Sequence, residues 1–221
     1  MKQVSKVVLI ALVWTIALGG LCFAFDDGDF QHWNTDSVSW KIDDDWKLTL
    51  EEEFRWGDNA RNPYYQHSDL NAAFFGLAQW LDVSASYRQV YEEKGGGWKA
   101  ENRPHMNATV KWKWSDFSFS NRGRFAYRNR EDAENFWQFR NKFTIKLPFK
   151  LTELEIQPYI ANEIFYDFNV NAYKRNRLSG GFAFKLLEHL KAELYYLWQS
   201  SEKNDDWNDT HVLGTKFKLS F

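Results

Sequence analysis

Apolar and polar residues alternate along most of the chain, from Ser37 to the last residue. Every second residue from Trp46 to Trp56, for example, is apolar except Glu52, and the residues between them are polar. A period of two residues is typical of a β-strand with one apolar and one polar face. No segment of comparable length has the period of a helix, so the chain is predicted to be all-β.

Short turns and longer polar segments alternate between the predicted strands. The short turns are at residues 43–45, 79–80, 113–115, 148–152 and 187–189, and the longer loops are at residues 57–66, 93–100, 129–135, 167–172 and 200–208. Strands of about ten residues separated in this way are typical of a transmembrane, antiparallel, up-and-down β-barrel. A bilayer offers no water to unpaired backbone groups, so a sheet can cross it only when the sheet is closed.

The number of strands is less clear than their type. Eleven alternating segments stand out, and the first of them covers residues 37–42. A single-chain barrel whose chain starts and ends on the same side of the membrane needs an even number of strands. We therefore expect twelve strands, with the additional one at residues 30–33. Ten strands is the alternative, if one segment is a loop.

A soluble β-sandwich or lipocalin-like barrel also has alternating strands and is the opposing interpretation. The apolar face of such a barrel points inward, and Trp, Phe and Tyr at nearly every apolar position would overfill a small barrel. Many aromatic residues also lie near the ends of segments, as Trp46 and Trp56 do, where interfacial girdles of membrane barrels lie. Both features favour the membrane barrel.

The first 24 residues have the pattern of a cleaved secretory signal peptide. Lys2 and Lys6 precede an apolar segment at residues 7–18, and Cys22 and Ala24 occupy positions −3 and −1 of a predicted cleavage site. A retained anchor helix is the alternative. Cleavage would remove the single cysteine of the chain. Residues 25–221 contain no Pro-rich or Ser-rich linker, so they are predicted to form a single domain.

The composition excludes two other classes of protein. A net charge of −2 gives no overall basic surface for nucleic acid, so no nucleic-acid partner is expected. Aromatic residues make up 19% of the chain, which is far more than a disordered chain contains.

Several short phrases of the chain combine Arg, Glu and Asn with aromatic residues. The phrases are WKLTLEEEFR (residues 46–55), YR (87–88), ENR (101–103), QFRNK (138–142), PYIANEIF (158–165) and NR (176–177). Together they resemble the domain of unknown function family 2490, and they extend over nearly the whole predicted mature chain. The resemblance implies an outer-membrane barrel with no assigned activity.

The C-terminal segment, residues 211–221, alternates and ends on the aromatic residue Phe221. This ending is similar to the C-terminal signature by which Gram-negative outer-membrane barrels are handed to the barrel-assembly machinery. The resemblance implies a location in the outer membrane of a Gram-negative bacterium. It also implies two partners, which are the lipids of that membrane and the assembly machinery, contacted through Phe221.

Charged residues lie on the polar phase of the strands, which faces the lumen of a membrane barrel. The predicted lumen-lining residues are Arg55, Arg88, Arg103, Arg122, Arg124, Arg128, Arg140, Lys142, Glu163, Arg175 and Arg177. Arg offers a planar fork that suits carboxylate and phosphate, so these residues are a candidate site for a small anionic solute. The same phase carries acids that could neutralise them, namely Glu51, Glu53, Glu101, Glu155, Glu163 and Glu193.

Three functions are compatible with this lumen. The first is a narrow porin-like channel or solute-binding barrel that favours small anions. The second is a structural barrel that is plugged by Arg–Glu pairs and serves envelope integrity without transport, because a barrel of twelve strands is intermediate between filled and open sizes. The third is a lipid-modifying barrel enzyme.

Four polar residues fall on the apolar phase of their strands. Asn121, Asn141 and Asn162 alternate with charged residues, so they are predicted to face the lipid, and Glu52 lies between Leu50 and Phe54. A polar residue in the centre of a bilayer is costly, so these positions call for a bulge, a partner or an interfacial location.

The sequence gives little support for catalysis. The five His residues are scattered over different segments without metal-ligand spacing. Ser84, Ser86, Ser118 and Ser120 occupy ordinary strand positions, and no Ser–His–acid motif connects them. We therefore expect no catalytic residues, no metal, no cofactor and no enzyme activity.

Overall fold

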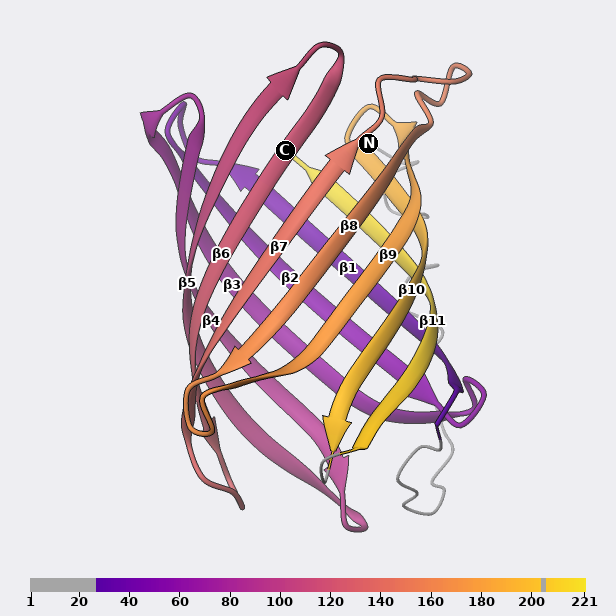
Figure 1. Ribbon diagram of the computed structural model, residues 1–221. Helices are drawn as coiled ribbons and strands as arrows, with labels where there is room; N and C mark the ends of the chain where they lie inside the picture. Colours follow the sequence, from indigo (N-terminus) through magenta and orange to yellow (C-terminus); the bar gives the residue numbers. More distant parts are fainter. Residues whose placement is uncertain (1–26, 204–205) are drawn as a thin grey trace, which may run out of the picture.

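The computed structural model describes residues 27–203 and 206–221, and these residues form a closed barrel of eleven β-strands (Figure 1). The predicted signal peptide, residues 1–24, lies outside the described residues. The strands are β1 (Asp29–Lys41), β2 (Trp46–Gly57), β3 (Asn62–Ala78), β4 (Leu81–Lys94), β5 (Gly97–Trp114), β6 (Phe117–Arg130), β7 (Phe136–Lys146), β8 (Gln157–Asp167), β9 (Ala172–Leu187), β10 (Leu190–Lys203) and β11 (Asp206–Ser220).

Each strand pairs with its neighbours in sequence, and the barrel closes between its first and last strands. Consecutive strands are antiparallel, whereas β1 and β11 are parallel, in a register that runs from Asp29 opposite Thr210 to Ser39 opposite Ser220. The prediction of twelve strands, or ten, was therefore wrong. An odd number of up-and-down strands leaves the first and last pointing the same way, and a parallel ladder can still satisfy their backbone groups.

The segments predicted as two separate strands at residues 30–33 and 37–42 are one strand, β1. The residues between them continue the ladder with β2, with Asn34 opposite Phe54 and Asp36 opposite Glu52. A turn needs residues that leave the extended conformation, and residues 34–36 stay in it. The two segments predicted here were therefore counted as two strands although they form one.

The connections are shorter than predicted at the lower rim of the barrel, the end in Figure 1 at which β1 starts. A loop was predicted at residues 93–100, but β4 and β5 are joined by Gly95 and Gly96 alone. Both glycines have positive φ angles, 61° and 84°, which glycine adopts without steric cost. Polar residues beside this turn stay in the ladder because backbone pairing does not require apolar side chains.

The connection between β7 and β8 is longer than predicted. A short turn was expected at residues 148–152, but residues 147–156 lie outside the named strands and contain an isolated bridge between Leu151 and Ile156. Glu155 therefore lies in a loop at the upper rim and not in the lumen, where the alternation had placed it. Its carboxylate accepts a hydrogen bond from Lys150 Nζ at 2.5 Å, which lowers the pKa of Glu155.

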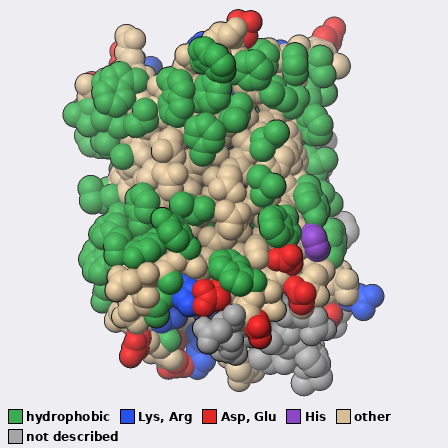
Figure 2. Space-filling view, in the orientation of Figure 1, with side chains coloured by type: hydrophobic (Ala, Val, Ile, Leu, Met, Phe, Trp, Pro, Cys, Tyr) green, Lys and Arg blue, Asp and Glu red, His purple; other side chains and the backbone are tan. Residues whose placement is uncertain are grey.

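On the face shown in Figure 2, hydrophobic side chains gather toward the two ends of the barrel, and charged side chains lie at its rims. Ten exposed Trp and Tyr residues lie near the two ends of the strands. Trp40, Trp46, Trp80, Trp112 and Trp114 are near the upper rim, and Tyr91, Trp98, Trp137, Tyr173 and Trp207 are near the lower rim. Within the described residues, no helix has the length and apolar character needed to cross a bilayer.

Some aromatic side chains face inward, which the sequence did not predict. Trp33, Tyr195, Leu197 and Val212 form a buried cluster on β1, β10 and β11. Their strand phase is that of the polar residues, as Trp33 lies between the buried Gln31 and Thr35. One wall of the barrel interior is therefore apolar.

Candidate functional site

Inward-facing side chains surround a cavity of about 540 Å³ inside the barrel. All eleven residues predicted to line the lumen are on its wall. They are Arg55, Arg88, Arg103, Arg122, Arg124, Arg128, Arg140, Lys142, Glu163, Arg175 and Arg177. They come from strands β2 and β4 to β9, so the fold brings together residues that are as much as 122 positions apart in the sequence.

The cavity wall carries a large excess of positive charge. It has thirteen cationic side chains, because Lys94, Arg130 and Lys216 join the ten cations predicted from the sequence, and it has four carboxylates, those of Glu51, Glu53, Glu92 and Glu163. Lys216 lies in a segment predicted as a strand, so its inward phase could have found it, whereas Lys94 and Arg130 fall in predicted loops at the ends of β4 and β6.

Glu163 is the counterion of several guanidinium groups. Its Oε1 is 2.9 Å from Arg122 Nη2 and 2.9 Å from Arg140 Nη2, and its Oε2 is 3.9 Å from Arg177 Nη1. The three arginines come from β6, β7 and β9, which lie around the β8 strand of Glu163. One carboxylate therefore holds three guanidinium groups in place and leaves this cluster with a positive charge.

A second carboxylate, Glu101, holds two more arginines. Arg103 Nε donates to Glu101 Oε1 at 2.7 Å, and Arg128 donates to both carboxylate oxygens at 2.7 Å. The bidentate contact of Arg128 is the strongest type of Arg–carboxylate geometry. Glu101 is buried, so its two arginines are fixed in position at the wall of the cavity.

Other acids pair with Arg55 and Arg88, and Glu92 of the wall pairs with Lys94 at 2.6 Å. Arg55 Nε donates to Glu53 Oε1 at 2.7 Å, and Arg88 Nε donates to Asp69 Oδ2 at 2.6 Å. Glu51 lies farther from the guanidinium group of Arg88, at 3.4 Å. These pairs neutralise the part of the wall formed by β2, β3 and β4 better than the part formed by β6 to β9.

Aromatic rings hold several guanidinium groups without neutralising them. The guanidinium carbon of Arg55 is 3.8 Å from the ring centre of Trp33 and 4.1 Å from that of Tyr65. Phe165 lies beneath Arg140 and Arg177, at 4.4 and 4.8 Å. A cation stacked on a ring is attracted to the ring but keeps its full charge. The inward aromatics therefore orient the arginines and leave the cavity cationic.

Five cations on the wall have no carboxylate within ion-pair distance in the described part of the chain, namely Arg124, Arg130, Lys142, Arg175 and Lys216. Arg124 donates from Nε to Asn107 Oδ1 at 2.7 Å, and Arg175 donates from Nε to Ser201 Oγ at 2.9 Å. Each keeps charged N–H groups that can bind an anion entering the cavity.

Two of the four Ser residues named above, Ser84 and Ser86, accept hydrogen bonds from an Asn side chain. Asn71 donates to Ser84 Oγ at 2.9 Å and to Ser86 Oγ at 2.5 Å. His105 lies opposite Ser86 in the register, but it directs Nδ1 to a backbone carbonyl, that of Arg103, at 3.3 Å. A nucleophilic serine needs a hydrogen bond to its base, and no such bond is present in the described ranges. Within those ranges the His, Asp and Glu residues also form no group that could hold a metal.

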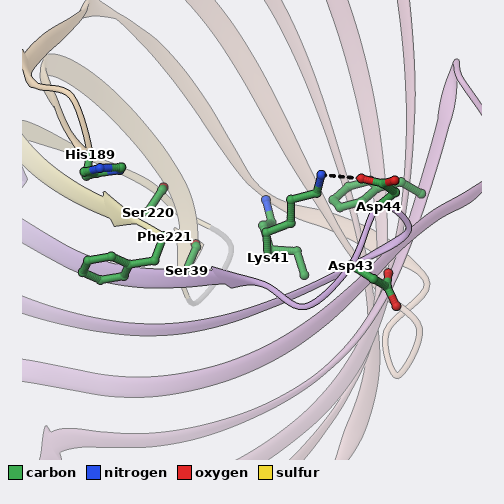
Figure 3. A pocket seen from close by; sticks show the side chains of 9 residues that line it. Ser39, Lys41, Asp43, Asp44, His189, Ser220 and Phe221 are labelled. Atoms are coloured by element: carbon green, nitrogen blue, oxygen red, sulfur yellow. Dashed lines mark hydrogen bonds and ion pairs between the residues drawn. The ribbon is translucent and has the colours of Figure 1, made fainter.

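A second cavity, of about 410 Å³, lies at the upper rim where β1 meets the C-terminus (Figure 3). Phe221 closes the seam, since its N–H donates to Ser39 O and its carbonyl accepts from Lys41 N, both at 3.0 Å. The ammonium group of Lys41 pairs with Asp44 at 2.6 Å. The other cation of this rim cavity, Lys47, lies over the Phe75 ring at 5.3 Å. The rim cavity therefore has one cation without a carboxylate partner among the described residues, whereas the lumen has several, so the lumen is the better candidate for a binding site.

Comparison with known families gives one match. The model of a family described as "Protein of unknown function (DUF2490)" matches residues 30–210, which include most of β1, all of β2 to β10 and the start of β11. No curated protein sequence matches the chain significantly.

Proposed function

The chain belongs to the DUF2490 family of proteins of unknown function, as its sequence had indicated, and we propose that it is an outer-membrane β-barrel whose lumen admits and binds small anions. The family description assigns no activity. The proposal therefore rests on the two faces of the barrel, the outer face for its location and the inner face for its solute.

The outer face supports a location in the outer membrane of a Gram-negative bacterium. Closed pairing leaves no unpaired strand edge, which is the condition for a sheet to cross a bilayer. Exposed aromatic residues near both rims match the interfacial girdles of such barrels, and exposed Leu, Ile, Val and Phe residues lie between them. Phe221, the C-terminal aromatic residue, is 59% exposed and is the residue we propose for recognition by the assembly machinery.

The observation that carries the choice of solute is the excess of cations over carboxylates on the wall of the cavity. Thirteen cationic side chains and four carboxylates line the cavity, and adding Asp69 and Glu101, which pair with arginines of the wall, raises the number of acids only to six. Clustered charges in a cleft with low-dielectric walls raise the local concentration of the opposite ion. An anion is therefore drawn into the lumen, and a cation is repelled from it.

The size and chemistry of the cavity define the class of solute further. Its volume of about 540 Å³ is in the range of small-molecule sites. Arg124 and Arg175 have guanidinium groups without a carboxylate partner among the described residues, and such groups bind carboxylate or phosphate in bidentate fashion. We expect a small hydrophilic solute with at least one carboxylate or phosphate group.

Anion binding is tested with inorganic phosphate and a small dicarboxylate, titrated calorimetrically into the purified barrel in detergent. We expect binding that weakens with added salt and that falls about tenfold in Arg124→Gln, because a charge-assisted hydrogen bond contributes about 1.5–3 kcal/mol. Arg61→Gln is the matched control, since Arg61 lies in the β2–β3 turn, outside the cavity wall. Equal affinities in the two variants would contradict the assignment.

One observation favours a second candidate, a sealed structural barrel. The ion pairs of Glu163 and Glu101 connect side chains of β5 to β9 inside the lumen and narrow it. A barrel sealed by these pairs would bind no added anion and carry no current, and its arginines would serve stability alone. The titration therefore separates the two functions.

A further inference from the structure

Six side chains inside the lumen form a continuous series of alternating aromatic rings and guanidinium groups, and we call this series the cation–π ladder. Its members, in order, are Tyr65, Arg55, Trp33, Arg177, Phe165 and Arg140. All six line the cavity of about 540 Å³. The ladder is therefore part of the surface that a solute in the lumen meets.

Two arginines of the ladder each lie over two rings. The guanidinium carbon of Arg55 is 3.8 Å from the ring centre of Trp33 and 4.1 Å from that of Tyr65. The guanidinium carbon of Arg177 is 4.8 Å from the ring centre of Trp33 and 4.8 Å from that of Phe165. Attraction to two rings restricts a guanidinium group more than attraction to one. The middle of the ladder is therefore well ordered.

Hydrogen bonds hold the same guanidinium groups by their N–H edges. Arg177 Nε donates to Gln199 Oε1 at 2.8 Å. Arg140 Nη2 donates to both carboxylate oxygens of Glu163, each at 2.9 Å. An arginine that is held through its plane and through its edge has few alternative positions, so the ladder is not a set of freely moving side chains.

One contact of the ladder reaches across the lumen. Arg177 is on β9 and Trp33 is on β1, and β10 and β11 lie between these two strands in the wall (Figure 1). Neighbouring strands are about 4.8 Å apart, so three steps along the wall amount to about 14 Å. The other four contacts join neighbouring strands. Arg177 and Trp33 therefore meet inside the barrel and not along its wall.

The ring of Trp33 also has support from the strands that the contact passes. Trp33 forms a buried cluster with Leu197 of β10 and Val212 of β11, and only 2% of Trp33 is exposed. The ring is thus a fixed platform, and the guanidinium group of Arg177 lies over it. These two side chains occupy space that an open barrel would leave to the solute.

We propose that the contact between Arg177 and Trp33 is the constriction of the lumen and sets the size of the largest anion that the barrel admits. This inference rests on the proposed function and adds a limit of size to it. The guanidinium group keeps its charge over the ring, so the constriction attracts a small anion while it obstructs a larger one.

Phe136 offers a matched control, because it has the same kind of contact without the crossing. Its ring lies beneath Arg128 and Arg130, at 5.0 and 4.8 Å. Both arginines are on β6, the neighbour of the β7 strand that carries Phe136. Phe136 is buried and is not among the described residues that line the cavity. Loss of this ring should leave the constriction in place.

Planar-bilayer recordings with chloride and gluconate, two anions of different size, test the constriction. We expect the wild type and Phe136→Ala to pass chloride and no measurable gluconate. Trp33→Ala should pass both anions, so its reversal potential with chloride on one side and gluconate on the other should shift toward that of equal permeabilities. A Trp33→Ala barrel that excludes gluconate as the wild type does, or an equal gain in Phe136→Ala, would overturn the inference.

Arg177→Gln breaks the same contact from its other side and decides the question if Trp33→Ala does not fold. It should also admit gluconate, although the lumen loses a positive charge. The double variant should gain no more than either single variant, because both changes remove one contact. Exclusion of gluconate by folded Arg177→Gln barrels would argue against a constriction at this place.

The same recordings separate this inference from the proposed function. Chloride selectivity of the wild type without a gain of gluconate permeability in the variants overturns the constriction and leaves the proposed function standing. A silent wild type beside a conducting Trp33→Ala overturns the proposed function and supports the constriction, since the ladder then closes the lumen. Silence of every folded variant overturns both.

Discussion

At the scale of the residue, the arginines of the lumen are held in two different ways. Glu163 and Glu101 bind several of them in hydrogen-bonded ion pairs, and the rings of Trp33, Tyr65 and Phe165 stack on some of them, including Arg140, which is held in both ways. Only the ion pairs remove charge. The mixture explains how a crowded set of cations can be ordered and still leave a net positive cavity.

Glu163→Gln tests the role of the shared counterion. The change leaves the buried Arg140 and the neighbouring Arg122 without their carboxylate, so we expect the free energy of unfolding to fall by about 3–5 kcal/mol. Urea unfolding in detergent micelles measures the loss. Glu155→Gln is the control, because Glu155 pairs with Lys150 in the exposed loop, and its midpoint should not change. Equal midpoints for both variants would show that Glu163 is not a buried counterion.

At the scale of the element, the inward ring of Tyr195 fits only because glycines lie opposite it in both neighbouring strands. Tyr195 of β10 lies opposite Gly181 of β9 and Gly214 of β11. A Cβ atom at Gly214 would overlap the ring of Tyr195, and one at Gly181 would come within 2.6 Å of Tyr195 Cβ. The two glycines therefore allow a large side chain to lie flat against the inner wall.

Gly214→Ala should destabilise the barrel by about 1–3 kcal/mol, as expected for overpacking. The added methyl group meets the ring of Tyr195, so the loss should largely disappear in the double variant Gly214→Ala, Tyr195→Ala, compared with Tyr195→Ala alone. Gly180→Ala is the control, since a Cβ there lies an ordinary 3.7 Å from Tyr159 O. Thermal unfolding in micelles measures all four proteins. A loss in Gly180→Ala as large as in Gly214→Ala would contradict the packing account.

The strands could be predicted from the sequence where the alternation of apolar and polar side chains marks them. Alternation found the strands and told the inner face from the outer, which is why the predicted lumen residues meet around one cavity. The first and last residues of each strand were harder to predict. Residues 34–36 look like a break because they are polar, yet their backbone continues in the ladder. A strand ends where backbone pairing ends, and the polarity of a side chain does not determine where that is.

The aromatic part of the site was missed for a related reason. Most aromatic residues of this chain lie on the outer face, and the predicted lining of the lumen contained no aromatic residue, so the inward rings of Trp33 and Tyr195 were not foreseen. Both have the phase of the inward residues, but a ring becomes possible there only where the opposite strands leave space, as Gly214 does for Tyr195. That space depends on the register between neighbouring strands, and the alternation within one strand gives no information on that register.

At the scale of the whole molecule, the barrel separates an apolar outside from a cationic inside. The parallel pairing of β1 and β11 closes the barrel and completes this separation. The count of predicted strands did not foresee a parallel closure. The chain as a whole carries a net charge of −2, so its positive lumen is offset by acids elsewhere, such as those in the rim turns. Net charge therefore conceals the property on which the proposed function depends.

The most direct test of this account is the reversal potential of the wild-type barrel in a planar bilayer under a gradient of potassium chloride. The cationic cavity predicts a small, steady conductance and a reversal potential of the sign given by chloride permeation. A reversal potential of the opposite sign, or no current from barrels shown to be folded and inserted, would contradict the claim that the lumen admits anions.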